Sequence, residues 1–188
     1  MLNRLLSAAA RGLETVNAPI ARWGLSISAF LLALMLAVAL AQIVSRGLFN
    51  HTLDWAEEAA RMALVWSALL AAPMGYRATG HVAITAFIEG LPRRVLLVVG
   101  VVVNLLVGWI CVMFLRESLD FVARGATIVA TALPLRMSWI YSVVPLALTA
   151  LWLVSLEVCA RLLLELRGVR EVGVLVGVVP VLQQDPEG

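Results

Sequence analysis

The stretch from Trp23 to Ser45, WGLSISAFLLALMLAVALAQIVS, holds 23 residues without a single charge. A helix needs about 20 apolar residues to cross a bilayer, so this stretch predicts a transmembrane helix. The whole chain agrees, because 62% of its 188 residues are hydrophobic and only 14% are charged. Soluble domains carry about 25% charged residues. The composition therefore excludes an ordinary soluble globule, a disordered chain and a nucleic-acid binder.

Three further segments extend the pattern along the chain. Residues 95–115 and 137–156 are also free of charge, whereas the block 62–76 is too short to span alone. The sequence Asp54-Trp55-Ala56-Glu57 is typical of a helix start, because acids cap the first turn and favour the positive end of the helix dipole. We therefore expect an all-α membrane protein, with one transmembrane domain over 23–165. Its four transmembrane helices are expected over 23–45, 54–78, 92–124 and 137–165.

The third expected helix is longer than a bilayer requires. From Pro92 to Arg124 there are 33 residues, or about 50 Å of helix. Arg116, Asp120 and Arg124 are four apart and can form a charge ladder, and Gly125 is a natural stop. This helix is therefore expected to be tilted or to protrude from the membrane.

The two ends of the chain are expected to lie outside the transmembrane domain. Residues 1–22 carry apolar side chains at near-helical spacing, which is compatible with a short cytoplasmic helix lying in the interface. The small residues of Ala39–Ala41 resemble a signal-peptide cleavage site, but the apolar run continues to Ser45, so we expect no cleavage. The tail 166–188 has an apolar part, 172–182, with no assigned role, and is expected to be partly disordered.

The distribution of arginine predicts the orientation. All 14 basic residues are Arg. With the N-terminus inside, the inner segments carry nine of these arginines and the outer segments carry five. Because inner loops are enriched in basic residues, both termini are expected to be cytoplasmic.

Small residues at a spacing of four predict helix contacts. Four alanines lie in this register on the first helix, and two glycines flank an asparagine on the third. Small side chains let a neighbouring helix approach closely, and a polar group within the membrane needs a hydrogen-bond partner. For that asparagine we favour a bond between helices over a substrate contact. The expected helix-packing residues are Ala29, Ala33, Ala37, Ala41, Gly100, Asn104 and Gly108.

No catalytic constellation stands out. There is no glycine-rich phosphate loop, no cluster of metal ligands and almost no ionisable group within the spans, so we expect neither an enzyme nor a stand-alone transporter. No cofactor or metal is expected. An alternative is the membrane anchor subunit of a redox enzyme that binds haem or quinone. Because His51 and His81 fall on opposite sides of the expected membrane, they cannot share one haem.

The start of the second expected helix concentrates polar and aromatic residues. Glu57 and Glu58 lie four and three residues before Arg61, so this arginine can meet either acid. The cluster is a local cap, a docking point for a partner subunit or, least favoured, a substrate or ion site. Trp55, Trp66 and Arg77 are spaced by eleven, close to three full turns, and so form one stripe.

These residues resemble a known family. The run Trp-Ala-Glu-Glu-Ala-Ala-Arg over 55–61, followed by Trp66, is similar to the start of helix 2 in the small membrane subunit of TRAP transporters, the tripartite ATP-independent periplasmic transporters. The inner loop and the entry to the fourth helix also match. The matching positions there are Arg77, Gly80, His81, Val82, Leu91, Pro92, Pro134, Trp139, Tyr141 and Pro145. One position departs, because Thr85 stands where the family commonly has an acid, and Glu89 is the next acid.

The resemblance implies a multi-pass protein of the bacterial inner membrane and a three-part transporter. Its expected partners are an obligate large membrane subunit, a transient periplasmic binding protein that captures an organic acid, and membrane lipids, with no nucleic acid. The large subunit would use a sodium gradient, and this chain would be its non-catalytic scaffold. We expect the partner interface to involve Trp55, Glu57, Glu58, Arg61, Trp66, Arg77 and His81.

Overall fold

The structure is a computed structural model that describes residues 2–49, 53–79, 93–130, 132 and 135–167. Within these residues the chain is helical, apart from an isolated antiparallel bridge between Val129 and Arg136. The expected all-α fold is therefore confirmed. The expectations for His51, His81, Thr85, Glu89 and the tail fall outside the described residues. The helices are α1 (Leu2–Phe49), α2 (Asp54–Thr79), α4 (Arg93–Gly125), α5 (Met137–Tyr141) and α6 (Val143–Leu166).

The N-terminal segment differs from the expectation. It forms no separate helix but continues into the apolar stretch, so that α1 has 48 residues and a length of about 72 Å. Pro19 lies inside this helix, where a proline costs about 3 kcal/mol. Asn17 and Ala21 on either side of it are each only 1% exposed. The packing of these neighbours offsets the cost of Pro19 and keeps α1 continuous.

The last helix also differs, because it is interrupted at Ser142, between α5 and α6. Pro145 explains the position of the break. A proline has no N–H to donate and is tolerated in the first turn of a helix but not in its interior. Because α6 restarts at Val143, Pro145 falls within that first turn.

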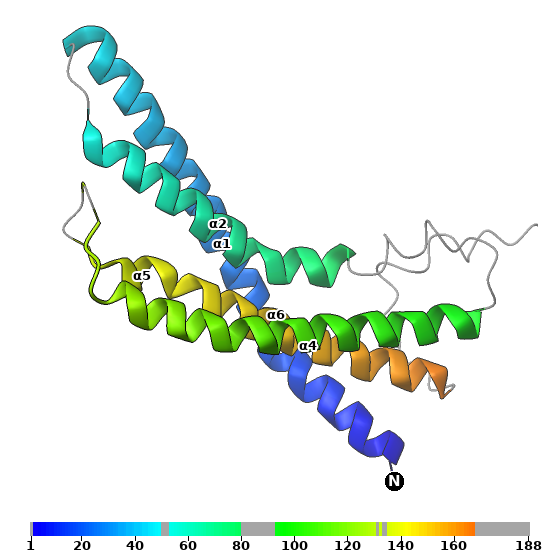
Figure 1. The fold of residues 1–188 in the computed structure, drawn as a ribbon. Coiled ribbons are helices and arrows are strands. Elements are labelled where there is room, and N and C mark those ends of the chain that lie inside the picture. Colours follow the sequence, from blue (N-terminus) through cyan, green and yellow to red (C-terminus); the bar gives the residue numbers. More distant parts are fainter. Residues whose placement is uncertain (1, 50–52, 80–92, 131, 133–134, 168–188) are drawn as a thin grey trace, which may run out of the picture.

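The helices of the described residues form two helical hairpins (Figure 1). In the first, α1 packs along α2, and in the second, α4 packs along α6. The first hairpin crosses the second through contacts of α1 and α2 with α6. Beyond this crossing the end of α1 lies apart from the second hairpin, whereas the start of α2 stays within hydrogen-bond distance of the α4–α5 connection. The arrangement is therefore open on one side rather than a closed four-helix bundle.

The residues of α1 that face α2 are spaced alternately three and four positions apart. We call this line of contact the seam. Gly24 and Ser28 are buried on this face, and a Cβ at Gly24 would lie 2.7 Å from the carbonyl oxygen of Leu70. One turn further, the Ser28 hydroxyl donates to the carbonyl oxygen of Ser67 at 2.6 Å. The alternating spacing keeps the same face of α1 toward its neighbour, as in coiled coils. The other positions in this register are Ala21, which is buried, and Leu31, Met35, Val38, Gln42 and Ser45, which are half-buried.

The alanine series of α1 lies outside this seam. Ala29, Ala33, Ala37 and Ala41 are all exposed in the single chain. Each step of four residues turns a helix by about 400°, so a strict series of four drifts about 40° per step around the axis. It cannot stay on a face defined by alternating steps of three and four. A packing role for these alanines, against another protein, stays a prediction.

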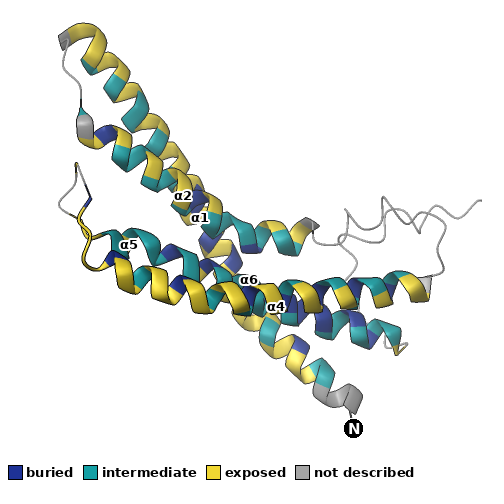
Figure 2. Ribbon diagram, in the orientation of Figure 1, coloured by how far each residue is buried: buried dark blue, intermediate teal, exposed yellow. Residues whose placement is uncertain are grey.

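Three parts of the described chain are long and apolar enough to cross a membrane. They lie within Leu6–Leu48, Arg94–Gly125 and Met137–Leu166. Only 6% of the most apolar window of the first is buried in the chain, against 28% and 39% in the others. In Figure 2 the upper part of α1 is mostly exposed, with half-buried residues between and almost none buried. Much of the apolar surface therefore faces lipid or another protein.

Candidate functional site

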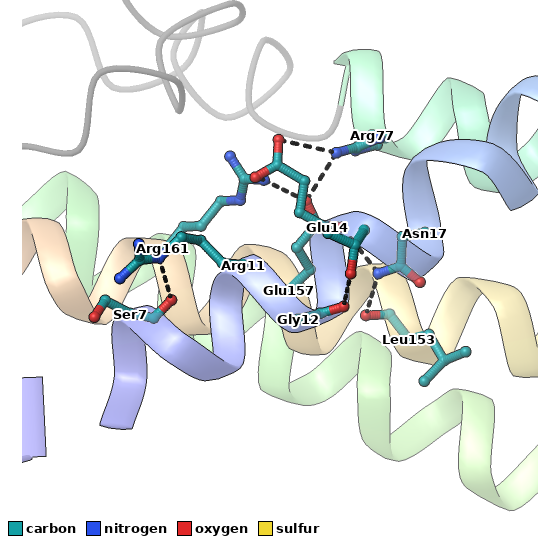
Figure 3. A network of polar contacts seen from close by, with 10 residues as sticks. Ser7, Arg11, Gly12, Glu14, Asn17, Arg77, Leu153, Glu157 and Arg161 are labelled. Carbon is teal, nitrogen blue, oxygen red and sulfur yellow. Dashed lines mark hydrogen bonds and ion pairs between the residues drawn. The ribbon is translucent and has the colours of Figure 1, made fainter. Parts of the chain in front are cut away.

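A network of charged and polar side chains lies where α1 and α2 cross α6 (Figure 3). We call it the crossing cluster, and it consists of Glu14 and Asn17 from α1, Arg77 from α2, and Glu157 and Arg161 from α6. These residues are up to 147 positions apart in the sequence. The cluster therefore joins both hairpins.

Glu157 is the centre of the crossing cluster. Its side chain is only 2% exposed, yet its carboxylate has three donors. Oε1 accepts hydrogen bonds from Arg77 at 3.0 Å and from Arg161 at 2.6 Å, while Oε2 accepts one from the Asn17 amide at 2.8 Å. Each donor comes from a different helix. A buried charge is tolerated when it is paired and hydrogen-bonded in this way.

Glu14 completes the charge balance from the exposed side. Its carboxylate lies 3.0 Å from Arg161 and 3.9 Å from Arg77. The cluster then holds two carboxylates and two guanidinium groups. Asn17 adds a second contact to α6, because its amide also donates to the carbonyl oxygen of Leu153 at 3.1 Å.

A neutral hydrogen-bond network lies next to the crossing cluster. The Tyr76 hydroxyl donates to Oδ1 of Asn104 at 2.7 Å, which links α2 to α4. The Ser155 hydroxyl of α6 donates to the Asn104 carbonyl oxygen at 2.6 Å. The Asn104 side chain thus has one partner on α2 and one within α4, because its amide donates to the Gly100 carbonyl oxygen at 2.8 Å.

The two glycines flanking Asn104 lie against α6. A Cβ at Gly100 would lie 3.2 Å from a methyl group of Leu162, and one at Gly108 would lie 3.4 Å from the hydroxyl of Ser155. Gly100, Asn104 and Gly108 are all buried. The structure therefore brings these three predicted packing residues together on one face.

The opposite end of α2 meets the second hairpin through two hydrogen bonds. The Trp66 indole donates to the carbonyl oxygen of Ile140 at 3.1 Å. The Glu58 carboxylate accepts from the backbone N–H of Ala132 at 2.7 Å. Trp66 and Arg77, eleven residues apart, thus both lie toward the second hairpin. They are used within the chain, although the sequence suggested a partner interface for them.

Glu57 and Arg61 lie on another side of α2. They pair with each other at 2.8 Å, and their side chains are 71% and 70% exposed. Trp55 is also exposed. The sequence allowed Arg61 to pair with either Glu57 or Glu58, and in the structure it pairs with Glu57. These three residues remain accessible to a partner.

Sequence reasoning missed the crossing cluster as a unit. Glu157 and Arg161 are four residues apart on the fourth expected helix, but their position at the end of a span gave no sign of burial. Glu14 and Asn17 lie in the segment expected to be separate from the bundle. Asn17, a lone amide among apolar residues, was the signal available for a contact between helices.

The fold and the polar contacts define a multi-pass helical membrane protein. Its family follows from a comparison with family models. The chain belongs to the DctQ component of the tripartite ATP-independent periplasmic transporters, whose model matches residues 35–165. No curated protein and no solved structure matches the chain.

Family membership places the chain among transporter subunits that are not catalytic, and a tripartite transporter has two further components. The matched region contains Arg77, Glu157 and Arg161. It begins after Glu14 and Asn17, so the α1 side of the crossing cluster lies outside it.

Proposed function

We propose that this chain is the scaffold subunit of a sodium-coupled transporter for an organic acid. It enlarges and supports the static part of a large transport subunit in the bacterial inner membrane, while a periplasmic binding protein delivers the substrate. Membership of the DctQ family supports the assignment to such a system. The sodium coupling and the acid substrate belong to the partners in this proposal.

The exposure of α1 is the observation that carries the scaffold role. Large apolar side chains on this helix are exposed in the single chain, among them Trp23 at 70%, Phe30 at 66% and Leu48 at 75%. Apolar surface of this extent on an open arrangement of helices favours contact with a larger membrane protein as well as with lipid. Beyond the crossing, α1 packs against α2 on one face. The other faces of this part of α1 do not contact the described helices.

We also propose four membrane spans with both termini in the cytoplasm. The helix α2 has 26 residues, about 39 Å, and packs along the apolar α1. Its charged first turn, with Glu57, Glu58 and Arg61, then lies at the outer interface. Arg77 and the crossing cluster lie at the inner end, in agreement with the larger number of arginines in the inner segments.

Within this topology the exposed Glu57–Arg61 pair is proposed as a docking point at the outer interface. Exposed ion pairs contribute about 0–1 kcal/mol to folding, so its removal leaves the chain folded. In contrast, loss of a central contact in an interface costs about 1–2 kcal/mol, or about five- to thirty-fold in affinity.

We therefore expect that a transporter carrying both Glu57→Ala and Arg61→Ala loses most of its substrate uptake. The variant chain should still be present in the membrane in the same amount as the wild-type chain. Radiolabelled substrate uptake in cells that carry both partner subunits measures this. Arg22→Ala, which also removes an exposed arginine, is the matched control and should transport normally. If the double variant assembles and transports as the wild type does, this docking role is wrong.

A further inference from the structure

A core cluster of buried apolar side chains near the crossing lies within the second hairpin. This core cluster consists of Leu97 from α4 with Val154, Val158 and Leu162 from α6. These residues all belong to the second hairpin. Among the described residues, Tyr76 is the one side chain of the first hairpin that packs against this core. This core cluster therefore stabilises the second hairpin, whereas the crossing cluster joins that hairpin to both helices of the first.

We propose that Glu157 is a positioning residue, which fixes the angle at which the first hairpin crosses the second. It thereby places the outer ends of the scaffold relative to each other. This placement would give the partner subunits a preformed binding surface, and that part of the inference rests on the proposed function. The positioning itself rests on the contacts of the crossing cluster.

The directions of the hydrogen bonds support this role. Asn17 of α1 and Arg77 of α2 reach Glu157 from different helices, and each uses its own oxygen. Apolar surfaces tolerate sliding and rotation, because the hydrophobic effect has no direction. Charged hydrogen bonds are short and directional, and leaving a buried charge unpaired is costly. A shift of one residue along α1, about 1.5 Å, would therefore break the arrangement.

The length of α1 amplifies any change at the crossing. Leu48 lies 31 residues beyond Asn17 in the same helix, which is about 46 Å. A rotation of about 10° at the crossing would therefore move the end of α1 by about 8 Å. The hydrogen bonds of Trp66 and Glu58 join α2 to backbone groups of the second hairpin nearer that end.

The test is a distance measurement in the full-length chain in lipid nanodiscs. Spin labels replace Leu48 on α1 and Arg124 on α4, two exposed residues near the outer ends. Pulsed electron paramagnetic resonance then gives the distribution of distances between the labels. We expect one narrow distribution for the otherwise wild-type chain.

The decisive variant combines Arg77→Leu with Glu157→Leu. It removes one base and one acid, so that Glu14 and Arg161 remain as a neutral pair 3.0 Å apart. We expect a folded chain whose distance distribution is broader and shifted to longer values. Tyr76→Phe is the matched control, because it removes the neutral bond to Asn104 from the neighbouring position and should keep the narrow distribution.

An unchanged distribution in the folded double variant would overturn the proposal. If that variant does not fold, Arg77→Lys and Arg77→Gln decide in its place: Lys keeps the charge and the narrow distribution, whereas Gln broadens it, and equal widths reject the positioning role. The distances are measured without the partner subunits. A failure of the positioning role is therefore distinct from a failure to bind the large subunit.

Discussion

Glu157→Leu alone is expected to lower the free energy of unfolding by about 3–5 kcal/mol, the cost of breaking a buried ion pair by removing one partner. The variant leaves Arg77 and Arg161 with only the half-exposed Glu14 as a carboxylate partner. The Asn17 amide also loses one of its two acceptors. Titration with sodium dodecyl sulfate in mixed micelles, followed by circular dichroism, measures the change.

The matched variant is Glu117→Leu, which removes an exposed acid from α4, outside the crossing cluster. Surface substitutions of this kind usually change stability by less than about 0.5 kcal/mol. If both variants unfold at the same detergent fraction as the wild type, the burial and pairing of Glu157 have no energetic role.

Gly24→Ala is expected to destabilise the first hairpin. The added Cβ would lie 2.7 Å from the carbonyl oxygen of Leu70, which belongs to the backbone of α2 and cannot rotate away. Overpacking of this kind typically costs about 1–3 kcal/mol. The two helices must separate, which also stretches the bond from Ser28 to the Ser67 carbonyl oxygen one turn away. The same unfolding titration gives the loss.

Gly47→Ala provides the control within the same helix. A Cβ at Gly47 meets no atom within 4 Å, and alanine is the better helix former by about 1 kcal/mol. This variant should therefore be as stable as the wild type or slightly more stable. Equal effects of the two substitutions would show that the close approach at Gly24 does not limit the packing of α1 on α2.

The positions of the helices were largely predictable from the sequence. The expected range 54–78 compares with Asp54–Thr79, and 92–124 compares with Arg93–Gly125. Charged residues, glycine and proline mark the ends of these two helices. Such residues act on the backbone next to them, so their effect can be predicted from the sequence alone. The continuity of α1 was not predictable, because the cost of Pro19 is offset by packing against helices distant in the sequence.

The contacts between helices were predictable only in part. Gly100, Asn104 and Gly108 mark the face of α4 toward α6, because small and polar residues in a membrane have few uses other than packing. On α1 the same rule selected Ala29 and its series, whereas Gly24 and Ser28 form the seam. Where alanine is abundant, spacing by four is a weak signal.

The crossing cluster shows what a single sequence does not contain. The sequence marked Arg77 as important, but its partner Glu157 is 80 residues away on a helix whose direction depends on the whole fold. Ion pairs over such distances follow from tertiary structure and not from local spacing. The exposed pair Glu57 and Arg61, four residues apart, was predictable for the opposite reason.

Co-purification from solubilised membranes tests most directly whether the chain is a scaffold subunit. A tagged full-length chain is isolated in mild detergent, and its partners are identified by native mass spectrometry. We expect a colourless complex with a large membrane protein, because the DctQ family belongs to a tripartite transporter. A soluble redox subunit, or a coloured preparation without such a membrane partner, would contradict the scaffold function.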